Sequence, residues 1–209
     1  FITLPFLHHG SVHSLFKSGS KGLASGGKDV YYRAKNREDI GWRKLLTNIV
    51  KRFVRIVAAK GEEVEAGNRC LIIDDSLLGK TGRKIEYVSR LWDHVTHRSI
   101  LGLRFLLLCY YDGRSTLPID FSIHRELGKN EQKPYGLTKR HLKQQHRNDR
   151  TEGSEGHQRA QEVDKSKIEI GIQMIKRGLR YLKVDYVLMD SWFTSESMIA
   201  CVRGHIKQN

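Results

Sequence analysis

The sequence predicts an α/β fold, built as a mixed sheet with flanking helices. Two short apolar runs, 70–73 and 187–189, have the length of buried strands, and each leads directly into aspartate. Between them lie two further apolar runs, 100–111 and 117–123, and the Asp-Gly pair at 112–113 is typical of a hairpin turn. The predicted sheet therefore contains an antiparallel hairpin between its first and last strands.

Helices are predicted before, between and after these strands. Residues 37–59 carry apolar side chains at helical spacing, and Asn36 is a suitable N-cap for them. Residues 163–182 show the same periodicity, and another helix is expected to start near Thr194. The resulting order is a strand with an acid, two antiparallel strands, a helix, a second strand with an acid, and a helix. That order is the order of the ribonuclease-H-like fold.

The composition indicates a polyanionic partner. The 209 residues include 37 Lys and Arg against 23 Asp and Glu, which gives a net charge of +14 and a pI near 9.8. A basic face gains affinity by releasing counterions from phosphates, so nucleic acid is the expected partner. No membrane span is predicted, because Arg104 interrupts the longest apolar run. Three widely separated cysteines without a CxxC pair indicate buried thiols in a reducing cytoplasm.

Two regions are expected along the chain. Residues 1–66 are predicted to be a helical and linker segment with a possible DNA contact, and residues 67–209 to be the ribonuclease-H-like domain. Within that domain, residues 128–160 are polar and basic and have too few apolar side chains to build a core. They are predicted to be an insertion that is partly disordered or ordered by a partner. The fifth strand of the fold has no counterpart, so the domain is expected to be truncated at its C-terminal end.

The acids that follow the strands suggest a metal site. Asp74 and Asp75 follow the first strand, and Asp190 follows the last. A strand holds a carboxylate rigidly, and Mg²⁺ prefers oxygen ligands and usually takes one or two protein carboxylates. Aspartate at the end of a strand is also a common turn former or helix cap. Either position alone is therefore weak evidence, and the pair is the stronger signal.

Basic residues gather in two places where contacts with phosphates are expected. The first group follows the first aspartates and contains Lys80, Arg83 and Lys84. The second group lies in the polar stretch and contains Lys139, Arg140, Lys143 and Arg147. Such contacts position nucleic acid without reading its sequence. Trp192, just after the last acid, is predicted to pack against the protein rather than to stack on a base.

Two segments resemble a known family. They read CLIIDDSLLGKTGRKIEYVSRLWDHVTHRSILGLRFLLLCYYDGRSTLPIDFSIHRE, at 70–126, and YVLMDSWFTSESMI, at 186–199. Both resemble bacterial insertion-sequence transposases of the DDE type, in the large group called insertion sequence four. The segment KDVYYRAKN, at 28–36, is similar to the part that precedes the catalytic domain in such proteins. The resemblance runs from about Asp29 to the end of the chain.

The resemblance implies catalytic residues and a reaction. The family's first catalytic aspartate aligns with Asp74, with Asp75 as the alternative, and the second aligns with Asp190. These three residues are the expected ligands of two Mg²⁺ or Mn²⁺ ions that serve cleavage and transfer of DNA strands. The family's third acid, a glutamate on a later helix, has no counterpart here. The chain is therefore expected to be a fragment that is inactive on its own.

The resemblance also implies partners and a location. Double-stranded DNA, as transposon ends and target, and a second copy in a homodimer are the expected partners, in the bacterial cytoplasm at the nucleoid. Two other hypotheses remain open. One is an inactive DNA-binding remnant of a transposase, and the other is a ribonuclease-H-like nuclease that acts on hybrids or junctions.

Overall fold

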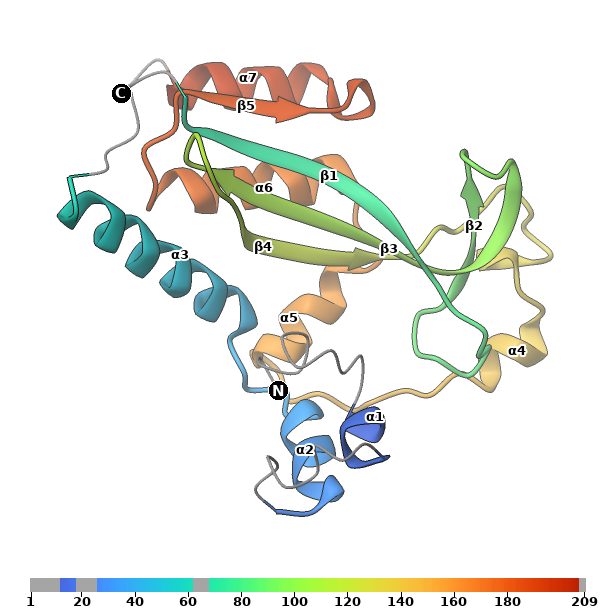
Figure 1. Cartoon of the computed structure of the whole chain (residues 1–209). Coiled ribbons are helices and arrows are strands. Elements are labelled where there is room, and N and C mark those ends of the chain that lie inside the picture. Colours follow the sequence, from blue (N-terminus) through green and yellow to red (C-terminus); the bar gives the residue numbers. More distant parts are fainter. Residues whose placement is uncertain (1–11, 18–25, 62–67, 207–209) are drawn as a thin grey trace.

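The computed structural model describes residues 12–17, 26–61 and 68–206, and a five-stranded mixed sheet forms its centre (Figure 1). The strands are β1 (Cys70–Gly79), β2 (Ser89–Asp93), β3 (Arg98–Tyr111), β4 (Thr116–His124) and β5 (Tyr186–Met189). Strand β3 pairs antiparallel with β1 on one side and with β2 and β4 on the other, and β5 extends the sheet parallel to β1. The predicted mixed α/β fold of the ribonuclease-H-like type is confirmed, and β2 is a strand that was not predicted.

Strand β1 is longer than its apolar run. It was predicted to end at Asp74, yet it continues to Gly79, because β3 is long enough to pair with it through Gly102. Strand β5 does stop at Met189, immediately before Asp190. The two acids therefore differ in context: Asp74 lies within a paired strand, and Asp190 follows the end of one.

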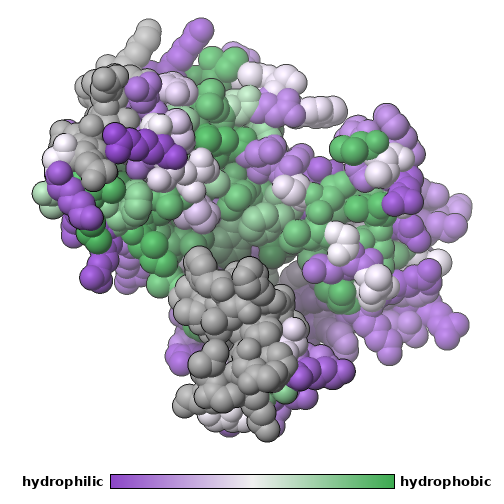
Figure 2. Space-filling view, in the orientation of Figure 1, coloured by the Kyte–Doolittle hydropathy of each residue, from purple (hydrophilic) through white to green (hydrophobic). Residues whose placement is uncertain are grey.

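The main core lies between the sheet and α6 (Lys167–Leu179), with α7 (Glu196–Ile206) packed beside α6. Two glycines let α6 approach closely, since a Cβ at Gly171 would lie 2.9 Å from Ile73 Cδ1 and one at Gly178 would lie 3.2 Å from Leu71 Cδ1. In Figure 1 α6 lies behind the sheet, and Figure 2 shows hydrophobic side chains across the opposite side. Leu188 of β5 is 48% exposed.

Helix α3 (Trp42–Ala59) begins five residues later than predicted. Asn36 does not cap it; it ends the preceding helix α2 (Lys28–Lys35), and its backbone N–H donates to the Tyr32 carbonyl oxygen at 3.0 Å. The N-cap of α3 is Gly41. A short helix, α1 (Val12–Lys17), packs beside α2.

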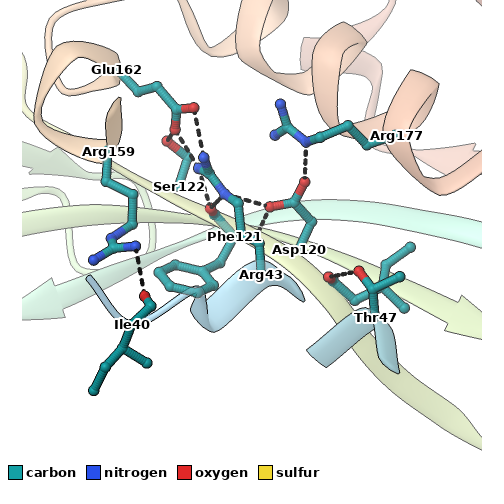
Figure 3. Close-up of polar contacts among 10 residues, drawn as sticks. Ile40, Arg43, Thr47, Asp120, Phe121, Ser122, Arg159, Glu162 and Arg177 are labelled. Atoms are coloured by element: carbon teal, nitrogen blue, oxygen red, sulfur yellow. Dashed lines mark hydrogen bonds and ion pairs between the residues drawn. The ribbon is translucent and has the colours of Figure 1, made fainter. Parts of the chain in front are cut away.

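A buried ion-pair network fastens α3 to the rest of the fold (Figure 3). Arg43 of α3 reaches Asp120 of β4 at 2.8 Å and Glu162 of the neighbouring helix, and its Nη2 donates to the Phe121 carbonyl oxygen at 2.7 Å. Arg177 of α6 contacts the same Asp120 at 2.7 Å. We call these four charged residues the Arg43 network. Because Val50 of α3 also lies in the main core, α3 packs as part of the sheet domain, although it precedes the predicted boundary at residue 66.

The predicted insertion at 128–160 is ordered against the sheet in this structure. It contains a short 3₁₀ helix (Pro134–Gly136) and two helices, α4 (Lys139–Lys143) and α5 (Glu155–Glu162), each with a serine or threonine N-cap. Arg150 pairs with Glu86 at 2.5 Å, and Leu137 is buried. Polar contacts replace the missing apolar core, so disorder was the wrong expectation for this stretch. Within the described residues, no helix is both long and apolar enough to cross a membrane.

Candidate active site

Asp74 and Asp190 lie next to each other on one face of the sheet. Ile73 of β1 pairs with Met189 of β5 in parallel register, so the two aspartates follow directly on paired residues. Side chains alternate along strands, and paired positions share a face, which places both carboxylates on the side away from α6. Both residues are exposed and line one groove of about 750 Å³. We call it the carboxylate groove.

The side chain of Asp75 lies on the α6 side of β1, borders the same groove and is held by two cations. It shares its face with Ile73 and with Arg104 of β3, whose Nη1 lies 3.4 Å from Asp75 Oδ1. Lys167, the first residue of α6, binds the other carboxylate oxygen through Nζ. Arg104 in turn contacts Glu126 at 2.6 Å. We call these four residues, Glu126, Arg104, Asp75 and Lys167, the Asp75 network.

The donor set of the groove suits a divalent cation. Asp74 Oδ1 accepts a hydrogen bond from the Asp75 backbone at 2.8 Å, and Asp190 Oδ1 accepts one from Ser191 Oγ at 2.9 Å. Neither carboxylate forms an ion pair with any other described residue. Among those residues, no cluster of three or more His, Cys, Asp or Glu could hold a metal. Two carboxylates on a rigid sheet match the one or two that Mg²⁺ usually takes, with water or phosphate completing its shell.

Aromatic side chains form the walls of the groove. Trp92 of β2 is 46% exposed, and Trp192, in the 3₁₀ turn Ser191–Phe193, is 74% exposed, so its predicted packing against the protein is wrong. The rings of Trp192 and His94 lie 6.0 Å apart. Asp93 also lines the groove, but its oxygens accept hydrogen bonds from Thr96 Oγ1 at 2.6 Å and the Val95 backbone at 3.0 Å, and these lower its pKa.

His124 is buried beside the Asp75 network. It pairs with Arg104 across β3 and β4 and is only 2% exposed. Burial lowers the pKa of its imidazole, an effect only partly offset by the nearby backbone of Lys165 and by nearby carboxylates. The ring is therefore neutral in the folded protein near neutral pH.

The two predicted basic groups form one surface. Arg83 Nη1 lies 3.2 Å from His141 Nε2 of α4, and the His146 backbone donates to the Lys84 carbonyl oxygen at 2.8 Å. These contacts place the β1–β2 connection against α4, which lies at the lower right in Figure 1. All seven predicted residues are exposed, and none pairs with a carboxylate of the described residues. We call this set, Lys80, Arg83, Lys84, Lys139, Arg140, Lys143 and Arg147, the basic surface.

The carboxylates and the basic surface were predicted from the sequence, whereas the contacts of the Asp75 network were not. Arg104 carried a usable signal, because a lone arginine inside an apolar strand needs a buried partner. Lys167 carried none, since its partner lies 92 positions earlier in the sequence.

Comparison with known proteins identifies the family of the chain. No curated protein and no solved structure matches the chain. One family model does match, that of the DDE superfamily endonucleases, over residues 22–204. Such enzymes generally use divalent metals, and DNA is their substrate. The match covers most of the sequence, including every strand, Asp74 and Asp190, and the chain therefore belongs to the DDE superfamily endonuclease family.

Proposed function

We propose that this chain is the catalytic domain of a bacterial insertion-sequence transposase, which cleaves and transfers DNA strands with Asp74 and Asp190 as metal-binding catalytic carboxylates. One observation carries the proposal. Two exposed carboxylates without ion-pair partners among the described residues directly follow the paired residues Ile73 and Met189, and they line one groove. Without a bound cation, two such neighbouring charges would repel each other.

Asp74 is the better choice than Asp75 for the first ligand. Asp75 would have to give up Arg104 and Lys167 before it could bind a metal, and both contacts are partly buried. Asp74 has no such competitor. Two Mg²⁺ or Mn²⁺ ions, when bound, would supply Lewis-acid stabilisation of the attacking and leaving oxygens at the scissile phosphate. The chain's own part is to hold Asp74 and Asp190 at a set separation on rigid strands.

DNA would lie across the groove and the basic surface. The seven basic side chains are free to contact phosphates, which fixes the register of DNA without reading its bases. A homodimer that holds two DNA ends, working at the bacterial nucleoid, completes the proposal.

The test is nicking of supercoiled plasmid in the presence of Mg²⁺ or Mn²⁺. Metal-dependent nicking that is lost in Asp74→Asn and in Asp190→Asn would support the proposal, and it would overturn the expectation, drawn from the missing third acid, that the chain alone is inactive. Nicking that persists in both variants, or in the presence of a chelator, would contradict the proposal. DNA binding without any nicking would favour the inactive DNA-binding remnant. The lack of a three-residue ligand cluster among the described residues is consistent with that alternative.

A further inference from the structure

Lys167 contacts one residue near each of the two proposed metal ligands. Its Nζ binds the carboxylate of Asp75, the residue after Asp74 on β1. The same Nζ lies 5.6 Å from the centroid of the Phe193 ring, three residues after Asp190. Phe193 is 2% exposed and belongs to the main core, so the ring that Lys167 contacts is held in place by core packing. One side chain from α6 therefore contacts the neighbour of Asp74 on β1 and the ring three residues after Asp190.

The surrounding charges hold Lys167 in place. Along the Asp75 network the charges alternate: Glu126 is negative, Arg104 positive, Asp75 negative and Lys167 positive. The network is neutral as a whole, and the side chains of Arg104 and Asp75 are 10% and 17% exposed. The side chains of Lys167 and Glu126 are 33% and 39% exposed, so Arg104 and Asp75 are the better shielded part of the network.

We infer that Lys167 is a positioning residue, which sets the separation of Asp74 and Asp190 by holding the β1 and β5 segments against the start of α6. The inference rests on the proposed function, because it concerns the same two carboxylates. Lys167 does not touch the metal or the DNA in this account. It acts through Asp75 and Phe193.

Removing Lys167 would change metal binding in opposite directions if Lys167 were only a nearby charge and if it positions the carboxylates. Its ammonium group lines the carboxylate groove, so it repels an incoming divalent cation. If Lys167 were only a nearby charge, its loss would tighten metal binding. If it positions the carboxylates, its loss weakens metal binding, as the loss of supporting contacts around metal ligands does elsewhere. The sign of the change therefore separates the two roles.

The experiment measures the Kd for Mn²⁺ by titration calorimetry in the wild type, Asp74→Asn, Lys167→Met, Lys167→Arg and Lys165→Met. Lys165→Met is the matched control, because Lys165 lies two residues away, is 46% exposed and has only a 3.9 Å contact with Glu169. A thermal melt of each variant confirms that it is folded at the assay temperature. If Lys167→Met does not fold, the Kd for Mn²⁺ of Lys167→Gln is compared with that of the wild type in its place.

We expect Lys167→Met to weaken Mn²⁺ binding by about tenfold. Lys167→Arg, which keeps the ion pair, should recover most of that loss, and Lys165→Met should stay within about twofold of the wild type, as expected for a distant, screened charge. Unchanged or tighter binding in Lys167→Met would overturn the inference alone, provided that the wild type binds Mn²⁺ through Asp74. No Asp74-dependent binding in the wild type would overturn both this inference and the proposed function.

Discussion

The carboxylates on the two faces of the sheet differ in their burial and in their ion pairs. On the face toward α6, Asp75 and Asp120 each contact two cations and are partly or fully buried. On the other face, Asp74 and Asp190 are exposed and form no ion pair with any described residue, although Arg104 and Lys167 border the same groove. Paired carboxylates of this kind hold elements together, whereas unpaired neighbours store repulsion that an external cation relieves. The contrast separates structural acids from candidate catalytic ones without reference to any relative.

Asp74 and Asp75 show the contrast within two consecutive residues. The alternation of side chains along β1 places Asp75 on the side of α6 and Asp74 on the other side, and both border the groove. Because neighbouring side chains of a strand lie on opposite sides, Asp75 forms structural ion pairs and Asp74 remains the candidate catalytic acid.

The largest expected effect tests the paired face. Arg43→Met would leave Glu162 and Asp120 short of a partner, and their side chains are only 10% and 6% exposed. We expect the free energy of unfolding to fall by about 3–5 kcal/mol, because a buried charge loses its partner. Urea denaturation measures the change.

An exposed pair provides the control for that experiment. Arg37 and Asp39 also pair, at 2.5 Å, but their side chains are 62% and 60% exposed. Arg37→Met should leave the urea midpoint unchanged. If both substitutions had equal effects, burial would not be what distinguishes the paired carboxylates.

A second stability experiment compares the neighbours directly. Asp75→Asn weakens two partly buried ion pairs and should lower the free energy of unfolding by about 2 kcal/mol. Asp74→Asn should not destabilise the protein in metal-free buffer, because it removes a charge that repels Asp190. A greater loss in Asp74→Asn than in Asp75→Asn would reverse the assignment of the two residues.

His124 is the exception on the paired face, and it predicts a dependence on pH. Its pKa in the folded protein is lowered by burial from the ordinary 6.5, so the unfolded chain binds the proton more readily. Stability from this residue is thus present above pH 6.5 and lost as the pH falls below it, by up to about 1.4 kcal/mol per pH unit. The range from pH 7.5 to 5.5 covers about one unit on either side of that ordinary pKa. Over this range the urea midpoint of His124→Leu should vary less than that of the wild type. An identical slope in the two proteins would mean that His124 is not held neutral.

The smallest expected effect concerns the basic surface. Removing one phosphate contact with Lys143→Ala should weaken binding of all DNA duplexes alike and reduce the salt dependence of log K by about 0.9. Fluorescence anisotropy at several salt concentrations measures that slope. A change confined to one DNA sequence would indicate base contacts instead.

Part of the fold was predictable because buried strands and helices carry recognisable patterns of apolar residues in the sequence. Four strands are apolar runs, and the periodicity of α6 follows from the face that it presents to the sheet. Strand β2 was missed because only Ser89 and Leu91 of its five residues are buried. Helices α4 and α5 were missed because polar contacts with distant residues, such as Glu86 with Arg150, stabilise them.

The candidate site was predictable to a similar extent. The sequence places acids after two apolar runs, and the strand register brings Asp74 and Asp190 together. It does not choose between Asp74 and Asp75, since that depends on which side of β1 α6 covers. The role of Lys167 depends on contacts with residues on β1 and after β5, and no local pattern reports them.

The most direct test of the central claim is calorimetric titration of Mn²⁺ into the wild type, Asp74→Asn, Asp190→Asn and Asp93→Asn. Asp93 lines the same groove, but its oxygens are already used by Thr96 and Val95, which makes it a matched control. The account predicts binding in the wild type and in Asp93→Asn, and none in Asp74→Asn or Asp190→Asn. Binding that survives both of the latter substitutions, or that only Asp93→Asn removes, would contradict it.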